Sequence, residues 1–120
     1  MENGELINIV GQSCRPDQEA KLTKWYEEVH IPGLLKFDGI KRVHCCQRVV
    51  AGKTQYDTPE ENYPQFVNIY EYKSPQAFAE YEKWRLESSP VGKDVNAMWA
   101  NDPVRRIWRV QYKIVKVLER

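Results

Sequence analysis

Alternating hydrophobic and polar positions predict four β-strands, because every second side chain of a strand lies on the same face. These segments are rich in Ile, Val and Tyr, which favour strands, and turn-forming residues flank them. The predicted strands are Glu5–Ser13, Ile40–Val50, Gln65–Lys73 and Val104–Leu118.

A helix is predicted between the first two strands, where apolar residues recur at the spacing of a helix that covers a sheet. It begins near Pro16 and carries an apolar stripe of Leu22, Trp25, Tyr26 and Val29. Pro32 cannot continue helical hydrogen bonding and disfavours helical geometry at Ile31. We therefore expect this helix to end at or just before His30.

A second helix is predicted after the third strand, with Ser74 as its N-cap and Pro75 at its first position. Its inner stripe consists of Phe78, Tyr81, Trp84 and Arg85. A further short helix is expected at residues 91–99. The polar segment Lys53–Pro64 has no periodicity and is expected to be a surface loop.

The order strand, helix, strand thus occurs twice in 120 residues, a length that suits a single domain covering residues 1–120. It predicts the α+β class and, more narrowly, a ferredoxin-like βαββαβ sandwich. In that fold both main helices cover one face of a four-stranded antiparallel sheet. The other face must then meet water or a second subunit.

Alternation divides the strand residues between these two faces. We expect the helices to cover Ile7, Ile9, Val43, Cys45, Val67 and Ile69. The open face then holds Asn8, Val10, His44, Cys46, Arg48, Phe66, Asn68, Tyr70, Tyr72, Arg106, Trp108, Val110 and Tyr112. An aromatic face of this size is rarely left bare on a monomer, so a homodimer is predicted.

Composition narrows the choice of partner. The formal net charge is +1, which gives no reason to expect binding to nucleic acid. No apolar stretch approaches the length that spans a membrane, and the N-terminus does not have the pattern of a secretion signal, so a cytoplasmic protein is expected. The three Cys form no CxxC motif and are expected to be reduced and mostly buried.

The segment from Trp25 to Pro32, followed by Phe37-Asp38-Gly39-Ile40, resembles EthD-like proteins of the dimeric α/β-barrel superfamily. Asp38 stands where those proteins usually have Pro. The resemblance implies a dimer in which two sheets close into a barrel, with a ligand cavity between sheet and helices in each protomer. It also implies a functional role for His30, as in related isomerases and cyclases.

The candidate catalytic residues are His30, His44 and Tyr70, since histidine exchanges protons readily near neutral pH and a tyrosine can donate to a carbonyl or enolate. The candidate substrate-binding residues are Asn8, Arg48, Asn68, Tyr72, Arg106 and Trp108. A structural role for His30 and interface packing for the tyrosines stay open. Glu27 and Glu28 are expected on a solvated helix face.

No spacing typical of a metal site, a nucleotide loop or a serine hydrolase is present, so no cofactor is expected. The predicted function is a cofactor-independent isomerase, cyclase or dehydratase acting on a small hydrophobic or aromatic molecule, polyketide-like or a lactone. Two alternatives remain, namely a cofactor-free monooxygenase of activated phenols and a non-catalytic binding protein.

Overall fold

The computed structural model describes residues 5–14, 16–49, 64–87 and 105–120, with the backbone alone described for residues 16 and 105–108. The elements are β1 (Leu6–Ser13), the 3-10 turn η1 (Pro16–Gln18), α1 (Glu19–Trp25), the π-helical turn η2 (Tyr26–His30), α2 (Ile31–Leu34), β2 (Ile40–Gln47), β3 (Phe66–Tyr72), α3 (Pro75–Glu87) and β4 (Arg105–Lys113). The helix expected at 91–99, and all of the expected loop but its last residue, lie outside the described residues.

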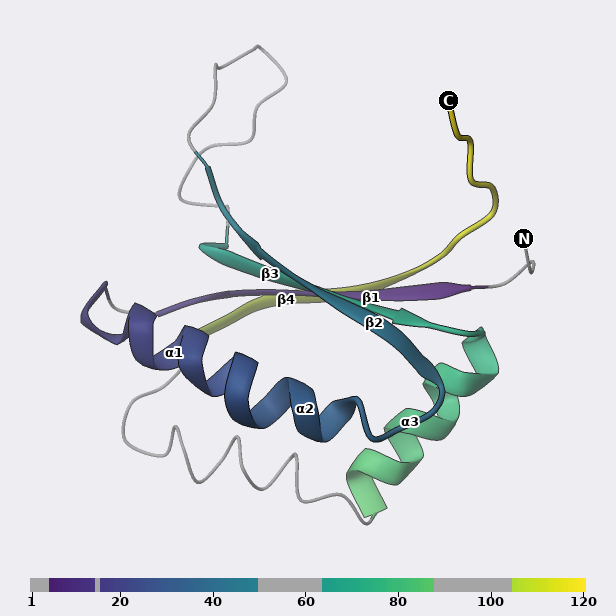
Figure 1. Cartoon of the computed structure of the whole chain (residues 1–120), viewed down its shortest axis with the longest axis horizontal. Coiled ribbons are helices and arrows are strands. Elements are labelled where there is room, and N and C mark those ends of the chain that lie inside the picture. The colour runs from purple at the N-terminus through teal and green to yellow at the C-terminus, as the bar shows by residue number, and fades with distance from the viewer. Residues whose placement is uncertain (1–4, 15, 50–63, 88–104) are drawn as a thin grey trace.

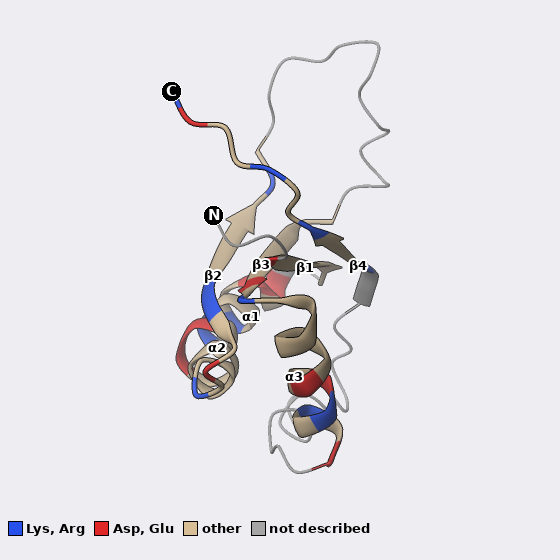
Figure 2. Ribbon diagram, turned by 90° about the vertical axis from the view of Figure 1, so that its right-hand side faces the viewer, with Lys and Arg blue, Asp and Glu red and all other residues tan. Residues whose placement is uncertain are grey.

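The sheet has the strand order β2-β3-β1-β4, and every neighbouring pair is antiparallel. The helices lie on one side of it, while the C-terminal segment rises on the other (Figures 1 and 2). This arrangement confirms the predicted ferredoxin-like α+β fold. No helix within the described ranges is long and apolar enough to cross a membrane.

The first helix continues one turn beyond His30, so its predicted end is wrong. The backbone N–H of Ile31 bonds to the carbonyl of Tyr26, five residues back, and α2 then runs to Leu34. Pro32 therefore lies in the first turn of α2, where the N–H that proline lacks is not needed. A π turn changes the hydrogen-bond register ahead of the proline and so permits the extra turn.

The second helix begins where the sequence predicts. The Ala77 N–H donates to Ser74 Oγ at 3.0 Å, which confirms Ser74 as the cap. Two predicted strands end early: β2 stops at Gln47 and β4 at Lys113. Within the tail beyond Lys113, Val115, Val117 and Leu118 are exposed.

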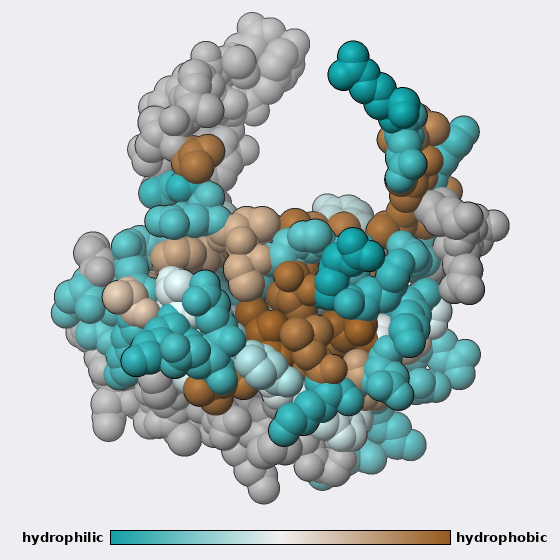
Figure 3. All heavy atoms as spheres, viewed as in Figure 1, coloured by the Kyte–Doolittle hydropathy of each residue, from teal (hydrophilic) through white to brown (hydrophobic). Residues whose placement is uncertain are grey.

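The residues beneath the helices form four rows across the sheet, because residues paired between adjacent strands share a face. From β2 toward β4 the rows are Ile40–Tyr72–Leu6–Lys113, Val43–Tyr70–Asn8–Gln111, Cys45–Asn68–Val10–Arg109 and Gln47–Phe66–Gln12. Leu6, Val10, Ile40, Tyr70 and Tyr72 form a buried core with Leu34 of α2 and Tyr81 of α3. In Figure 3 apolar atoms gather at the centre of the view, where the layer between the sheet and the helices is seen from its edge.

The open face carries the alternate rows, Arg42–Glu71–Ile7–Tyr112, His44–Ile69–Ile9–Val110 and Cys46–Val67–Gly11. The predicted faces are therefore correct for the described residues of β2 and β4 and inverted for β1 and β3. Asn8, Val10, Phe66, Asn68, Tyr70 and Tyr72 lie beneath the helices, whereas Ile7, Ile9, Val67 and Ile69 lie on the open face.

The inversion has a packing reason. The Tyr72 ring contacts Phe78 and Tyr81 of α3, with ring centroids 5.1 Å and 5.5 Å apart. Large aromatic side chains thus bridge the sheet and the helix, and the shorter Ile and Val side chains are left for the opposite face.

Candidate functional site

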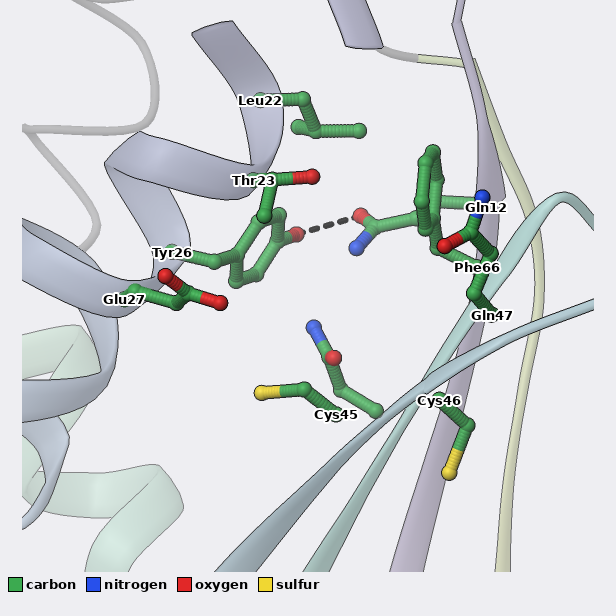
Figure 4. A pocket seen from close by; sticks show the side chains of 10 residues that line it. Gln12, Leu22, Thr23, Tyr26, Glu27, Cys45, Cys46, Gln47 and Phe66 are labelled. Carbon is green, nitrogen blue, oxygen red and sulfur yellow. Dashed lines mark hydrogen bonds between the residues drawn. The ribbon is translucent and has the colours of Figure 1, made fainter. Parts of the chain in front are cut away.

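A cavity of about 140 Å³ lies between the first helix and one end of the sheet. The helix contributes Leu22, Thr23, Tyr26 and Glu27, and the strands contribute Gln12, Cys45, Cys46, Gln47, Phe66 and Asn68. In Figure 4 the Tyr26 ring points from the helix toward the Gln12 amide. A dry cavity of about 150 Å³ can hold one benzene ring, so this space matches a single six-membered ring.

The buried part of the cavity has both apolar and amide groups. Leu22 is 1% exposed, while Gln12 is 2% and Asn68 4% exposed. The Tyr26 hydroxyl donates a hydrogen bond to Gln12 Oε1. Gln12 Nε2 and Asn68 Nδ2 have no hydrogen-bond partner within the described part of the chain. An unpaired buried donor costs about 1–3 kcal/mol, so a ligand that supplied an acceptor would relieve a real penalty.

An aromatic cluster holds Tyr26 in place. The His30 ring stacks on Trp25, with centroids 4.6 Å apart and an interplanar angle of 19°. The same His30 ring meets Tyr26 nearly edge-on, at 5.2 Å and 87°. His30 does not itself line the cavity, but it contacts a residue that does.

The rim of the cavity is exposed and includes three groups that can exchange protons, the Glu27 carboxyl and the thiols of Cys45 and Cys46. Partial burial raises the pKa of the Cys45 thiol, and the nearby Glu27 carboxylate raises it further. The thiol therefore stays protonated at neutral pH, which leaves the carboxylate as the better proton acceptor.

The predicted catalytic residue Tyr70 lies in the core beneath the helices and does not line the cavity. Burial raises its pKa well above the ordinary tyrosine value; nearby Tyr26 adds to the shift and Asn68 opposes it. Burial also raises the pKa of Tyr72 strongly. Both phenols thus remain neutral and serve the packing in this arrangement.

His44 lies on the open face, away from the cavity. Its Nε2 is 2.5 Å from Glu71 Oε2, and Arg42 Nε lies 3.3 Å from the same oxygen. The structure therefore does not bring His44 together with His30 and Tyr70. Arg48, also predicted for this region, is exposed just beyond β2 and does not line the cavity.

The remaining predicted substrate-binding residues are placed as follows. Asn8 is buried and accepts a hydrogen bond from Gln111 Nε2 at 2.9 Å, outside the cavity. Asn68 is the one predicted site residue with a described side chain that lines the cavity. The side chains of Arg106 and Trp108 lie outside the described part of the structure.

Sequence reasoning missed Gln12, Glu27 and Cys45 as cavity residues. Glu27 is exposed, as predicted for a solvated helix face, yet it also borders the cavity. The sequence feature that could have located the cavity was Tyr26. It follows Trp25 on the predicted inner stripe, so its polar hydroxyl was expected to point at the sheet. Within the described residues no group of three or more His, Cys, Asp or Glu side chains is placed to hold a metal ion.

Several solved structures share this fold over nearly the whole chain. A candidate monooxygenase from Shewanella loihica PV-4 has a TM-score of 0.59 and 13% identity, with 98% of this chain and 100% of that chain covered. HapK from Hahella chejuensis has a TM-score of 0.65 and 12% identity, with 97% of each chain covered. An EthD family protein from Bacillus halodurans C-125 has a TM-score of 0.57 and 11% identity, with 91% and 98% covered.

These structures are of the dimeric α/β-barrel type, so the fold of the single chain implied by the resemblance of the Trp25–Ile40 segment is confirmed, while the dimer stays a prediction. At such low identities the likeness concerns the fold alone. No model of a protein family and no curated protein matches the chain.

Proposed function

We propose that this chain binds a small molecule with one aromatic or lactone-type ring in the cavity between α1, η2 and the sheet. We further propose that it catalyses a cofactor-independent proton transfer of the kind used in isomerisation, cyclisation or dehydration. The observation that carries the proposal is the cavity itself, because apolar walls, hydrogen-bonding groups and a carboxylate at the rim converge on a space of one-ring size.

The apolar part of the cavity suits a ring. Leu22 and Phe66 supply hydrophobic contact from the helix and the sheet, and both belong to a small apolar cluster around Trp25. Burying such a ring is worth about 25 cal/mol for each Å² of apolar area removed from water. Ring binding therefore needs no charged anchor.

In the proposed chemistry the Glu27 carboxylate removes a proton from a carbon next to the ligand carbonyl. The electron pair of the broken C–H bond forms a C=C bond, and the carbonyl π electrons move to oxygen to give an enolate. In a ligand with a C=C bond next to the deprotonated carbon, the enolate extends over that bond. Return of the proton to the far carbon of that bond shifts the C=C bond into conjugation and restores the carbonyl, with no oxidant, reductant or metal consumed. A positioned acid or base of this kind contributes about 10²–10⁴-fold in rate.

His30 has a positioning role in this proposal. Its ring lies against Tyr26, and the Tyr26 hydroxyl is bonded to Gln12. A change at His30 would therefore reach the ligand through the orientation of Tyr26. His44 has no part in this cavity, since it pairs with Glu71 on the opposite face.

We also propose that the open face of the sheet is covered by the same face of a second copy. Ile7, Ile9, Val67 and Ile69 lie side by side there, and Tyr112 is 56% exposed. The solved structures with the same fold are of the dimeric α/β-barrel type, which favours a homodimer over another occupant. In such a dimer His44, Glu71 and Arg42 would meet the partner subunit.

A suitable test uses α-angelica lactone, a one-ring lactone that isomerises to its conjugated form by proton transfer alone. The protein is expected to accelerate this reaction, followed by ultraviolet absorbance, and Glu27→Gln is expected to lower the rate by about 10²–10⁴-fold. Glu28→Gln is the matched control, because Glu28 is the exposed neighbour that does not line the cavity. His30→Ala is expected to lower the rate by a smaller factor.

The outcomes separate the alternatives. Binding of the lactone without acceleration would favour a non-catalytic binding protein. Full activity of Glu27→Gln would overturn the assigned base. Consumption of dioxygen with an activated phenol would favour the monooxygenase, an alternative supported by the description of the Shewanella loihica structure.

A further inference from the structure

We infer that Gln12 and Asn68 form a two-donor site for a carbonyl or enolate oxygen, so that the ligand of this cavity is a ring compound bearing a carbonyl group. This inference rests on the proposed function, because it assumes that the cavity binds a small molecule. It adds the chemical class of that molecule and the two residues that select it.

The two side chains come from neighbouring strands and reach the same space. Gln12 is on β1 and Asn68 on β3, in adjacent rows of the sheet face beneath the helices. Both line the cavity, and both are more than nine-tenths buried. A ligand atom in the cavity can thus contact one amide side chain from β1 and one from β3.

Hydrogen bonding fixes which end of the Gln12 amide is available. Its Oε1 accepts from the Tyr26 hydroxyl, so its Nε2 has a donor to offer elsewhere. Asn68 Nδ2 likewise has no partner of normal hydrogen-bond geometry within the described residues. A side-chain hydrogen bond from Asn68 also lowers the pKa of the Tyr70 phenol, although burial outweighs this influence, so one of the two Asn68 amide hydrogens is left for a ligand. Each of the two cavity-lining side chains therefore keeps an amide N–H group without a matching acceptor within the described residues.

Amide N–H groups select oxygen acceptors, and they do so more strongly as negative charge develops on the oxygen. A carbonyl oxygen gains that charge when a neighbouring carbon loses a proton to form an enolate. Donors fixed in a buried site stabilise this charge without reorganising. The pair consequently complements the Glu27 carboxylate at the rim, which would take the proton.

The charges along the described part of the cavity lining narrow the choice of ligand further. The ten lining residues that the structure describes include no Lys, Arg or His, and Glu27 brings a negative charge to the rim. A ligand already anionic, such as a carboxylate, would be repelled by Glu27 without gaining an ion pair. The site therefore favours a neutral carbonyl compound over an acid.

The test compares acetophenone with α-methylstyrene, in which a CH₂ group replaces the carbonyl oxygen on the same planar frame. Binding of each at millimolar concentration is followed by NMR of the ¹⁵N-labelled full-length chain. The protein is expected to bind acetophenone at least about tenfold more tightly, and the side-chain NH₂ resonances of Gln12 and Asn68 are expected to shift with acetophenone alone. These resonances are assigned from their loss in Gln12→Glu and Asn68→Asp.

The same two variants test the donors directly. Gln12→Glu keeps the oxygen that accepts from Tyr26 and removes only the donor, and Asn68→Asp makes the equivalent change. Each is expected to abolish the preference for acetophenone while α-methylstyrene still binds. Gln111→Glu is the matched control, since it makes the same change on the same sheet face outside the cavity, and it should keep the preference.

Variant folding is checked by the dispersion of backbone resonances, and Gln12→Met and Asn68→Leu repeat the test without added charge. Equal binding of the two probes, with shifts at Leu22 and Phe66 but not at the two amides, would overturn the donor site and leave the proposed cavity intact. If neither probe shifts Leu22 or Phe66, the cavity is not a ring-binding site and both proposals fail.

Discussion

In the two central strands, β1 and β3, the amide and tyrosine side chains lie beneath the helices, whereas most of the Ile and Val side chains lie on the open face. Beneath the helices, Tyr70, Tyr72, Asn68 and Gln12 are buried. On the open face, Ile9 and Ile69 are only partly buried, although they occupy the two central strands. The more polar side chains are thus the better covered ones.

This difference indicates separate tasks for the two faces. Buried polar groups require partners, and the helix-covered face meets this requirement partly through its own hydrogen bonds and partly, in our proposal, through a ligand. On the open face the charged groups Arg42, His44 and Glu71 already pair with one another, and the Ile and Val side chains beside them need apolar contact, which a second sheet can provide. The face beneath the helices therefore lacks hydrogen-bond acceptors for its amide groups, whereas the open face lacks a surface that covers its apolar side chains.

The largest expected effect is on the free energy of unfolding, and it compares the contributions of the two sheet faces to stability. Tyr72 is 1% exposed and packs against Phe78 and Tyr81, so Tyr72→Ala is expected to lower the free energy of unfolding by about 3–5 kcal/mol. Tyr112→Ala, on the open face, is expected to change it by less than about 1 kcal/mol in the monomer. Urea denaturation at concentrations where the protein is monomeric measures both. Equal losses would contradict the assignment of the core to the helix side.

The second-largest effect is on the dissociation constant of the dimer, and it tests whether a second copy of the chain covers the open face. Ile69→Asp places a charge in the row between His44 and Ile9, and it is expected to raise the dissociation constant of the dimer at least about a hundredfold, or about 2.7 kcal/mol. Sedimentation velocity at micromolar concentration measures this change. Leu35→Asp, at an exposed position after α2, should leave the dimer intact. A wild-type protein that sediments as a monomer would rule out the proposed dimer.

The smallest effect concerns the ionisation of the buried phenols. Burial raises the pKa of Tyr81 to about 12, and the nearby Arg85 opposes part of this shift. The unfolded chain loses this proton from about pH 10, so the folded state binds more protons between these values and the unfolding free energy falls as pH rises. Tyr81→Phe is expected to reduce that fall by at most about 1.4 kcal/mol per pH unit. An unchanged pH slope in denaturation experiments would show that Tyr81 ionises normally in the folded protein.

The sequence predicted the element order, the sheet type and the fold, because these depend on local periodicity and on known packing of such elements. It could not predict which face of β1 and β3 the helices cover. Alternation separates Asn8 from Ile9 but does not say which of them points at a helix. Assigning Ile and Val to the helix side followed hydrophobicity, whereas the actual arrangement follows side-chain length, with Tyr72 reaching α3.

The candidate site was predictable only in part for a related reason. Its lining combines Gln12, Tyr26, Cys45 and Asn68, which come together only once the strand registers and the helix position are known. Asn68 was identified, but for the opposite face of the sheet. His30 was identified through resemblance to a family, and its edge-on contact with Tyr26 is seen only in the structure.

The π turn at Tyr26–His30 also divides the first helix into two parts with separate attachments. Leu22 and Trp25, ahead of the turn, belong to one apolar cluster, and Leu34, beyond it, belongs to the main core. Deleting one residue from the turn would restore a regular helix and rotate everything after it by about 100°. Substitutions ahead of the turn can instead reshape the cavity wall while the main core stays packed. The ligand specificity of the cavity can therefore change during evolution without a loss of fold stability.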